Sequence, residues 1–331
     1  MKKIAILGGG SWGTTLANLL AEKGLDVSLW NRNSNIFIKR KNKLYNKKYL
    51  PDYELSKNLS IQNNLEKAIN SSQLLIIAIP SKYFKEFSRK ISKYLTNQKV
   101  LILTKGIEKK SFMTMSEVFI QETKFPKKSV MVLSGPNIAD EIMRKNISAS
   151  VIAGKNLSTL EKVSQLFNTK YFKTFISQDI KGVEMSGALK NLYAICSGLS
   201  DGLGFESNTK AMLLTRALKE MSNLFQEIKA NPKTLLGLSG VGDLIATSSS
   251  TKSRNYSFGF LLGQGISPKE ALDKIDQSVE GFGTLKVIFQ KKNKFRIKMP
   301  IVDVLYQIIY LDKNPKKCFL NFLNESGNID T

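Results

Sequence analysis

Residues 3–13 read Lys-Ile-Ala-Ile-Leu-Gly-Gly-Gly-Ser-Trp-Gly, a short apolar run that ends in three successive glycines. The run 3–7 is typical of a buried strand, and the segment 12–23 that follows it has Leu16, Leu19 and Leu20 at helical spacing. A second apolar run, 26–30, comes directly afterwards. A strand, a crossover helix and a second strand in this order predict a βαβ unit with parallel strands.

The same alternation continues through the N-terminal half. Further strands are predicted at 74–79, 99–104, 130–134 and 149–153, so we expect a doubly wound, Rossmann-type parallel sheet. After about residue 180 the strand signal ends, and apolar residues recur at helical spacing. They form two groups: Ala188, Leu189, Leu192, Ile195, Cys196 and Leu199, and then Leu214, Leu218, Met221, Leu224, Phe225 and Ile228. The expected fold class is therefore α/β, with a dinucleotide-binding domain at 1–180 and an all-helical substrate domain at 181–331.

The glycines at the first strand–helix junction fit the pattern Gly-x-Gly-x-x-Gly. Gly8 permits the tight turn, Gly10 lets the backbone approach a pyrophosphate, and Gly13 allows the helix to pack closely on the strand. The first N–H groups of the helix that follows are expected to face the phosphates. This context predicts dinucleotide binding.

The end of the second strand bears on which dinucleotide is bound. NAD enzymes commonly carry an acidic residue there for the ribose hydroxyls, but this chain has Asn31 and Arg32. Arg32 can pair with a 2′-phosphate, so NADP is expected to be accepted or preferred over NAD. The alternative is a solvent-facing arginine on a loop.

The chain has no histidine. Hydride transfer to a carbonyl leaves charge on oxygen, and that charge needs a proton donor or a cation. Two cysteines and no histidine also argue against a catalytic zinc, so no metal is expected. Lys190 is the only charged residue between Glu184 and Asp201, and it lies in an apolar helix where desolvation favours loss of its proton. Lys190 is therefore either the general acid/base or a structural lysine that snorkels or pairs with a carboxylate.

Other polar residues stand where a ligand could reach them. Lys105 follows a predicted strand at its carboxyl end, where such sheets bind ligands. Asp243 lies in a glycine-rich turn, and Ser253, Arg254 and Asn255 together suit a phosphate group. For Lys105 this position favours a function, whereas Asp243 and the residues 253–255 could each, taken alone, be ordinary loop chemistry.

The formal net charge of +23 raises nucleic-acid binding as an alternative function. Only seven of the 50 basic residues are arginine, and the lysines are spread along the chain, so no nucleic-acid partner is expected. The densest cluster, 39–48, is better explained as a solvated loop than as a path for an anionic ligand. No apolar stretch is long enough to span a membrane, and the N-terminal run lacks a cleavage site, so we expect a cytoplasmic protein with no membrane partner.

Several motifs occur in an order that matches one family. They are Gly-Gly-Gly-Ser-Trp-Gly at 8–13, Tyr-Leu-Pro at 49–51, Thr-Lys-Gly at 104–106, Ser-Gly-Pro at 134–136, Gly-Ala-Leu-Lys-Asn at 187–191, Gly-Val-Gly-Asp at 240–243, Ser-Arg-Asn at 253–255 and Val-Glu-Gly at 279–281. The chain resembles the bacterial NAD(P)-dependent glycerol-3-phosphate dehydrogenases over nearly its whole length. The resemblance implies reduction of dihydroxyacetone phosphate to sn-glycerol 3-phosphate for glycerophospholipid synthesis.

The resemblance also implies residue roles. Lys190 would be the general acid/base, Asp243 would position the reacting end, and Lys105 would contact both substrate and cofactor. The other substrate contacts would be Gly135, Asn137, Ser253, Arg254 and Asn255, and the other cofactor contacts Ser11, Trp12, Arg32, Ala139, Arg254 and Glu280. The substrate would be a small-molecule phosphate, and a homodimer is one assembly that the sequence allows.

Two departures from the family pattern stand out. Asn137 replaces the usual Ser or Thr after Ser-Gly-Pro, which leaves its role open, and Ser249 lies where a cysteine is common. The nearest enzyme alternative is a 3-hydroxyacid or 6-phosphogluconate-type dehydrogenase, which shares the two-domain plan and a lysine acid/base but commonly recognises a carboxylate. Gly-Val-Gly-Asp together with Ser-Arg-Asn favours the phosphate substrate.

Overall fold

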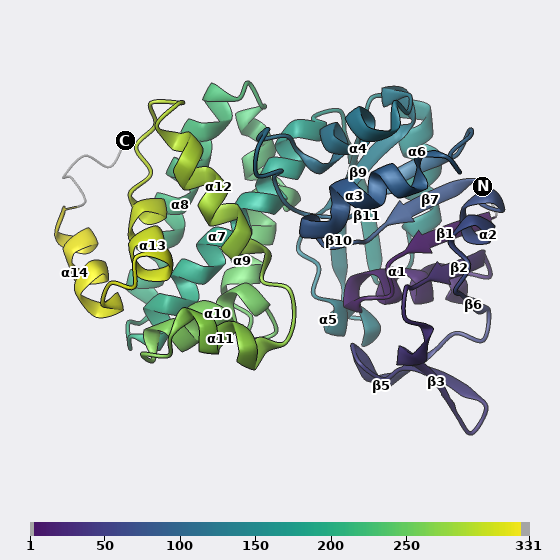
Figure 1. Ribbon diagram of the computed structural model, residues 1–331, viewed down its shortest axis with the longest axis horizontal. Helices are drawn as coiled ribbons and strands as arrows, with labels where there is room; N and C mark the ends of the chain where they lie inside the picture. The colour runs from purple at the N-terminus through teal and green to yellow at the C-terminus, as the bar shows by residue number, and fades with distance from the viewer. Residues whose placement is uncertain (1–2, 326–331) are drawn as a thin grey trace. The chain divides into compact units, whose positions relative to one another are not determined.

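The computed structural model describes residues 3–325, which fall into two compact units (Figure 1). Of the described residues, the first unit comprises 3–105 and 113–184, and the second comprises 106–112 and 185–325. The short segment Gly106–Phe112 thus belongs with the C-terminal part of the chain.

The first unit is built on an eight-stranded sheet with the order β11-β10-β9-β8-β7-β1-β2-β6. The pairs β1–β2, β1–β7, β7–β8 and β8–β9 are parallel, as predicted. The strands are β1 (Lys3–Leu7), β2 (Asp26–Trp30), β6 (Leu59–Gln62), β7 (Leu74–Ile77), β8 (Lys99–Ile102), β9 (Val130–Ser134), β10 (Ser148–Gly154) and β11 (Phe172–Ser177).

Helices cover both faces of this sheet. They are α1 (Ser11–Glu22), α2 (Leu65–Asn70), α3 (Ser81–Ser92), α4 (Met115–Thr123), α5 (Ala139–Met143) and α6 (Leu157–Phe167). Alternate residues of β1 enter two separate hydrophobic clusters: Ile4 and Ile6 pack with Leu16 of α1, whereas Ala5 and Leu7 pack with Phe84 of α3. Because successive side chains of a strand point to opposite faces, the sheet is buried on both sides, which confirms the doubly wound prediction.

One strand departs from the all-parallel prediction: β10 runs antiparallel to β9, with Ile152 opposite Leu133. The connection between them contains only the five-residue helix α5. Such a helix is about 7.5 Å long at about 1.5 Å per residue, which is too short to carry the chain back along a strand. The chain therefore turns back beside β9, and the parallel order resumes between β10 and β11.

The lysine-rich segment 39–48 is not a loop, which corrects that prediction. A separate three-stranded sheet contains β3 (Phe37–Arg40), β4 (Lys43–Asn46) and β5 (Leu50–Leu55), and it follows the short 3-10 turn Ser34–Ile36. Lys41 and Asn42 connect β3 to β4 with positive φ angles of 47° and 63°. Two successive residues in this conformation are typical of a tight β-hairpin turn.

From residue 185 to the last described residue, the second unit is built from helices. Its helices are α7 (Ile180–Gly202, which begins in the first unit), α8 (Ser207–Glu227), α9 (Asp243–Ser248), α10 (Arg254–Gly263), α11 (Pro268–Ile275), α12 (Glu280–Lys292), α13 (Pro300–Tyr310) and α14 (Pro315–Glu325). The 3-10 turn Pro232–Leu236 and the π-helical turn Leu238–Gly242 precede α9. Both predicted apolar groups enter one core, and Cys196 and Cys318 are buried free thiols.

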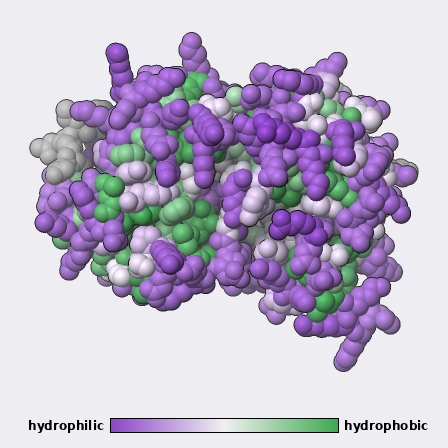
Figure 2. All heavy atoms as spheres, viewed as in Figure 1, coloured by the Kyte–Doolittle hydropathy of each residue, from purple (hydrophilic) through white to green (hydrophobic). Residues whose placement is uncertain are grey.

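Across residues 3–325, no helix is both long and apolar enough to cross a membrane. Within the same range, no cluster of three or more His, Cys, Asp and Glu side chains is arranged to hold a metal ion. Figure 2 shows hydrophilic side chains spread over the visible face of each unit.

Candidate active site

The glycine-rich turn of the first unit lies between β1 and α1. Gly8 has a φ of +122°, a conformation that side-chain-bearing residues rarely adopt, and its N–H donates to Trp30 O at 2.9 Å. A Cβ added to Gly13 would stand 2.0 Å from Gly8 O. The turn therefore needs glycine at both positions, for the tight turn and the close packing that the motif predicts.

Gly10 precedes the first turn of α1 in an extended conformation, and no side chain among the described residues caps the helix there. Ser11 and Trp12 are the first two helical residues. The first N–H groups of a helix have no partner within the helix, and the helix dipole adds positive potential. This geometry suits the pyrophosphate of a dinucleotide.

Asn31 and Arg32 follow the end of β2. The Asn31 side chain is bound to the backbone: its Oδ1 accepts from Gly9 N–H at 3.1 Å, and its Nδ2 donates to Asn33 O at 2.6 Å. Arg32 is exposed. The position after β2 therefore presents a cation and no carboxylate.

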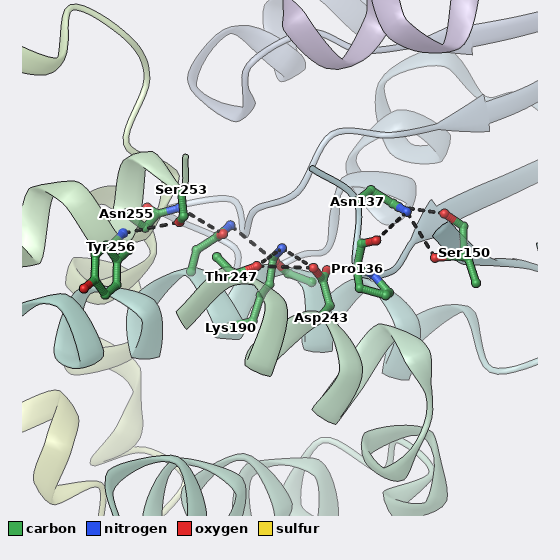
Figure 3. A network of polar contacts seen from close by, with 12 residues as sticks. Pro136, Asn137, Ser150, Lys190, Asp243, Thr247, Ser253, Asn255 and Tyr256 are labelled. Carbon is green, nitrogen blue, oxygen red and sulfur yellow. Dashed lines mark hydrogen bonds and ion pairs between the residues drawn. The ribbon is translucent and has the colours of Figure 1, made fainter. Parts of the chain in front are cut away.

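Four other candidate residues of the first unit lie at the ends of strands β8 and β9. Lys105 comes three residues after β8, Gly135 directly follows β9, and Ala139 begins α5. Asn137 is tied to β10: its Nδ2 donates to Pro136 O at 3.0 Å and to Ala149 O at 3.1 Å, and its Oδ1 accepts from Ser150 Oγ at 2.6 Å (Figure 3). The Asn137 amide thus fixes the Ser-Gly-Pro loop against the neighbouring strand.

In the second unit, Lys190 of α7 points at Asp243 and Thr247 of α9 (Figure 3). Lys190 Nζ donates to Asp243 Oδ1 and, at 2.6 Å, to Thr247 Oγ1. Lys190 is 6% exposed and Asp243 is 0% exposed. The lysine is therefore buried and has both an ionic and a neutral partner. Partners are needed here because burying an unpaired ammonium costs a large amount of free energy.

Local structure explains how α9 presents these two partners. Asp243 is the first residue of α9, where the helix dipole stabilises a carboxylate. Thr247 lies four residues later, so it shares a face of the helix with Asp243, and its Oγ1 is 3.3 Å from Asp243 Oδ1. One turn of helix thus supplies both an ionic and a neutral partner to the ammonium.

A second network joins the start of α10 to α7 and α12. Asn255 Nδ2 donates to Asn191 Oδ1 at 3.0 Å, and Asn255 Oδ1 accepts from Gly281 N–H at 2.9 Å. Ser253 caps α10 by accepting from Tyr256 N–H at 3.3 Å. Arg254 and Glu280 are the first residues of α10 and α12.

The structure therefore brings the predicted residues into two groups. The first unit carries Gly8, Gly10, Ser11, Trp12, Gly13 and Arg32 around one turn, and Lys105, Gly135, Asn137 and Ala139 at neighbouring strand ends. In the second unit the Asn191–Asn255 bond links the helix of Lys190 to the start of α10. Sequence reasoning missed Thr247 and Asn191. The i, i+4 spacing of Thr247 from Asp243, and the position of Asn191 beside Lys190, were the available signals.

Comparison with known proteins identifies the family of the chain. A family model described as the NAD-dependent glycerol-3-phosphate dehydrogenase N-terminus matches residues 3–160, and the model of the C-terminus matches residues 179–320. A Psychrobacter cryohalolentis protein named glycerol-3-phosphate dehydrogenase [NAD(P)+] is 43% identical over 311 residues, which are 94% of this chain and 72% of the relative. A Carboxydothermus hydrogenoformans protein of the same name is 39% identical over 95% of this chain and 94% of its own length.

Solved structures give the same result. The crystal structure of glycerol-3-phosphate dehydrogenase from Coxiella burnetii superposes with a TM-score of 0.91 at 33% sequence identity, covering 97% of this chain and 98% of that one. The matched regions include the glycine turn in the first unit and the Lys190–Asp243 pair in the second. The chain belongs to the NAD-dependent glycerol-3-phosphate dehydrogenase family.

Proposed function

We propose that this protein is an NAD(P)-dependent oxidoreductase that reduces dihydroxyacetone phosphate to sn-glycerol 3-phosphate, with Lys190 as the general acid. The observation that carries the mechanism is the buried contact of Lys190 with Asp243 and Thr247 in a chain without histidine. The names of the relatives support the substrate and the cofactor.

The residues of the first unit fit a dinucleotide. The uncapped start of α1, the Gly8 turn and the exposed Arg32 are suited to a pyrophosphate and to a ribose that carries a 2′-phosphate. The bound nicotinamide would supply the hydride to the carbonyl carbon. Ser11, Trp12, Lys105, Ala139, Arg254 and Glu280 complete the proposed cofactor contacts.

The proton comes from the protein. As the carbonyl carbon accepts the hydride, its oxygen becomes an alkoxide, and the Lys190 ammonium donates a proton to that oxygen. Asp243 and Thr247 both accept from Lys190 Nζ and so fix its direction before the transfer. After the reaction Lys190 is neutral and is reprotonated from solvent.

The substrate phosphate is assigned to the start of α10. Ser253 supplies a hydroxyl and Arg254 a guanidinium, and both stand at the N-terminus of the ten-residue helix α10. All three features favour binding of an anion. The Asn255 amide bonds to Asn191 and Gly281, so we assign it the additional task of holding α10 against α7 and α12. Lys105, Gly135 and Asn137 are the proposed substrate contacts from the first unit.

The test is to follow the absorbance of NADPH and, separately, of NADH with dihydroxyacetone phosphate. We expect oxidation of the nucleotide only when both enzyme and substrate are present. A lack of turnover with either nucleotide, or faster turnover on 3-hydroxyacids or 6-phosphogluconate, would contradict the proposal.

Three finer points remain part of the proposal. The product would feed glycerophospholipid synthesis, the enzyme would act in the cytoplasm, and it would form a homodimer. Light scattering on the protein as it elutes from a size-exclusion column tests the homodimer, since a dimer has twice the chain mass of 37.1 kDa.

A further inference from the structure

Asn46 is the last residue of β4 and is fully buried, with 0% of its surface exposed. Its Nδ2 donates to Gly9 O at 2.9 Å and to Thr14 Oγ1 at 2.9 Å. Its Oδ1 accepts from Tyr49 N–H at 3.2 Å. One amide therefore joins the three-stranded sheet to the glycine-rich turn and to α1.

The turn is held at Gly9 by two side chains. Asn31 accepts from Gly9 N–H, and Asn46 donates to Gly9 C=O. The ring of Phe37 in β3 packs against Gly9, since a Cβ added to Gly9 would stand 2.8 Å from the ring. Both peptide groups of Gly9 thus have defined directions.

The direction of the Gly9 carbonyl has a consequence for the next residue. The peptide bond is planar and trans, so the C=O of Gly9 and the N–H of Gly10 point in opposite directions. By holding the carbonyl toward β4, Asn46 aims the Gly10 N–H away from β4. Gly10 is the residue through which the motif brings backbone to the pyrophosphate.

We propose that Asn46 is a positioning residue for the dinucleotide: it fixes the Gly9–Gly10 peptide so that the turn is prepared for the pyrophosphate before binding. This inference rests on the proposed dinucleotide function. The role of the three-stranded sheet, residues 37–55, is then to place Asn46 and Phe37 against the glycine-rich turn.

The main test compares Asn46→Ala with a matched control, Asn18→Ala. Asn18 is also buried in α1, and its Oδ1 accepts from Ser56 N–H at 2.7 Å, so it likewise ties α1 to the segment that follows β5. Its Nδ2 donates to Glu22 Oε1 and Met143 Sδ, which lie outside the glycine turn. The measurements are the Kd of NADPH by fluorescence, kcat at saturating NADPH, KM for dihydroxyacetone phosphate, and Tm.

For Asn46→Ala we expect the Kd of NADPH to rise by about tenfold or more, which corresponds to about 1.4 kcal/mol. We expect kcat and the substrate KM to stay within about threefold of wild type, since Lys190 and the phosphate residues are untouched. Asn18→Ala should lower Tm and leave the Kd of NADPH within about twofold.

If Asn46→Ala does not fold, Asn46→Leu carries the test, because it keeps the size of the side chain but loses the donor to Gly9 and adds no charge. We expect the same rise in the Kd of NADPH in this variant. A Kd within about twofold of wild type in Asn46→Ala or in Asn46→Leu, or an equal loss of affinity in Asn18→Ala, would overturn the inference. Wild-type protein that binds neither NADPH nor NADH would instead overturn the proposed function.

Discussion

Replacing Lys190 with methionine keeps an unbranched side chain of similar length and removes the ammonium that Asp243 and Thr247 contact. Proton transfer by a positioned side chain commonly contributes about 10² to 10⁴-fold, or roughly 3–5 kcal/mol of the barrier. We therefore expect kcat to fall by about that factor or more. Because Lys190 is not among the proposed nucleotide contacts, the Kd of NADPH should stay near its wild-type value.

The same substitution leaves a charge behind. Asp243 is 0% exposed, and removing one partner of a buried ion pair commonly destabilises a protein by about 3–5 kcal/mol. This cost is as large as the catalytic effect, so a loss of activity in Lys190→Met alone could come from loss of fold.

A double variant separates the two effects. Lys190→Met combined with Asp243→Asn removes both charges, so Tm should recover toward the wild-type value while turnover stays low. The assays are NADPH oxidation with saturating dihydroxyacetone phosphate, NADPH fluorescence titration, and thermal melting. Turnover of either variant within about tenfold of wild type would refute Lys190 as the proton donor.

Three further predictions follow from single residues. Arg32→Ala should raise the Kd of NADPH and leave the Kd of NADH nearly unchanged, since Arg32 is assigned to the 2′-phosphate. A wild-type enzyme that uses NADH alone would contradict this assignment. Arg254→Ala should raise the KM for dihydroxyacetone phosphate, because loss of a guanidinium at a buried anion commonly costs about 2–5 kcal/mol; an unchanged KM in steady-state assays would place the phosphate elsewhere. Burial raises the pKa of the Glu220 carboxyl from 4.5 to about 8, against the opposing effect of bonds from Ile301 N–H and Tyr193 OH. Between about pH 5 and pH 8, Glu220 is thus protonated in the folded chain and ionised in the unfolded one. Its contribution to the free energy of unfolding is therefore lost as the pH rises toward 8. The Tm of Glu220→Gln should therefore gain on that of wild type between about pH 5 and pH 8, and a constant difference across that range would show that the carboxyl does not titrate with folding.

The sequence predicted the central strands well because they are buried on both faces. Residues 4–7 and 130–133 are continuous apolar runs, as parallel strands between two helical layers require. The strands that were missed, β6 and β11, lie at the two ends of the sheet order and mix polar with apolar residues. Edge strands need less apolar surface, so their signal is weaker.

The three-stranded sheet was missed for a different reason. Its strands carry many lysines, which favoured a solvated loop, and the turn at Lys41 and Asn42 lacks the glycine that often marks a hairpin. The pairing partners that decide the structure, such as Phe37 with Asn46, are visible only once the chain has folded back.

The candidate site divides along the same line between local and long-range information. Lys190 stands out in the sequence because a charge within an apolar helix is unusual, and Gly8 and Gly13 stand out because a tight turn excludes side chains there. Their polar partners carry no such mark. Asn46 and Thr247 are residue types that are common on protein surfaces. They are distinguished only by their burial and by their contacts with residues far along the chain, 37 residues away for Asn46 with Gly9 and 57 for Thr247 with Lys190. A buried polar side chain must find its partners to be tolerated. The amides and hydroxyls that reach across the fold to a glycine turn or a lysine are therefore the positions where the structure adds most to what the motifs predict.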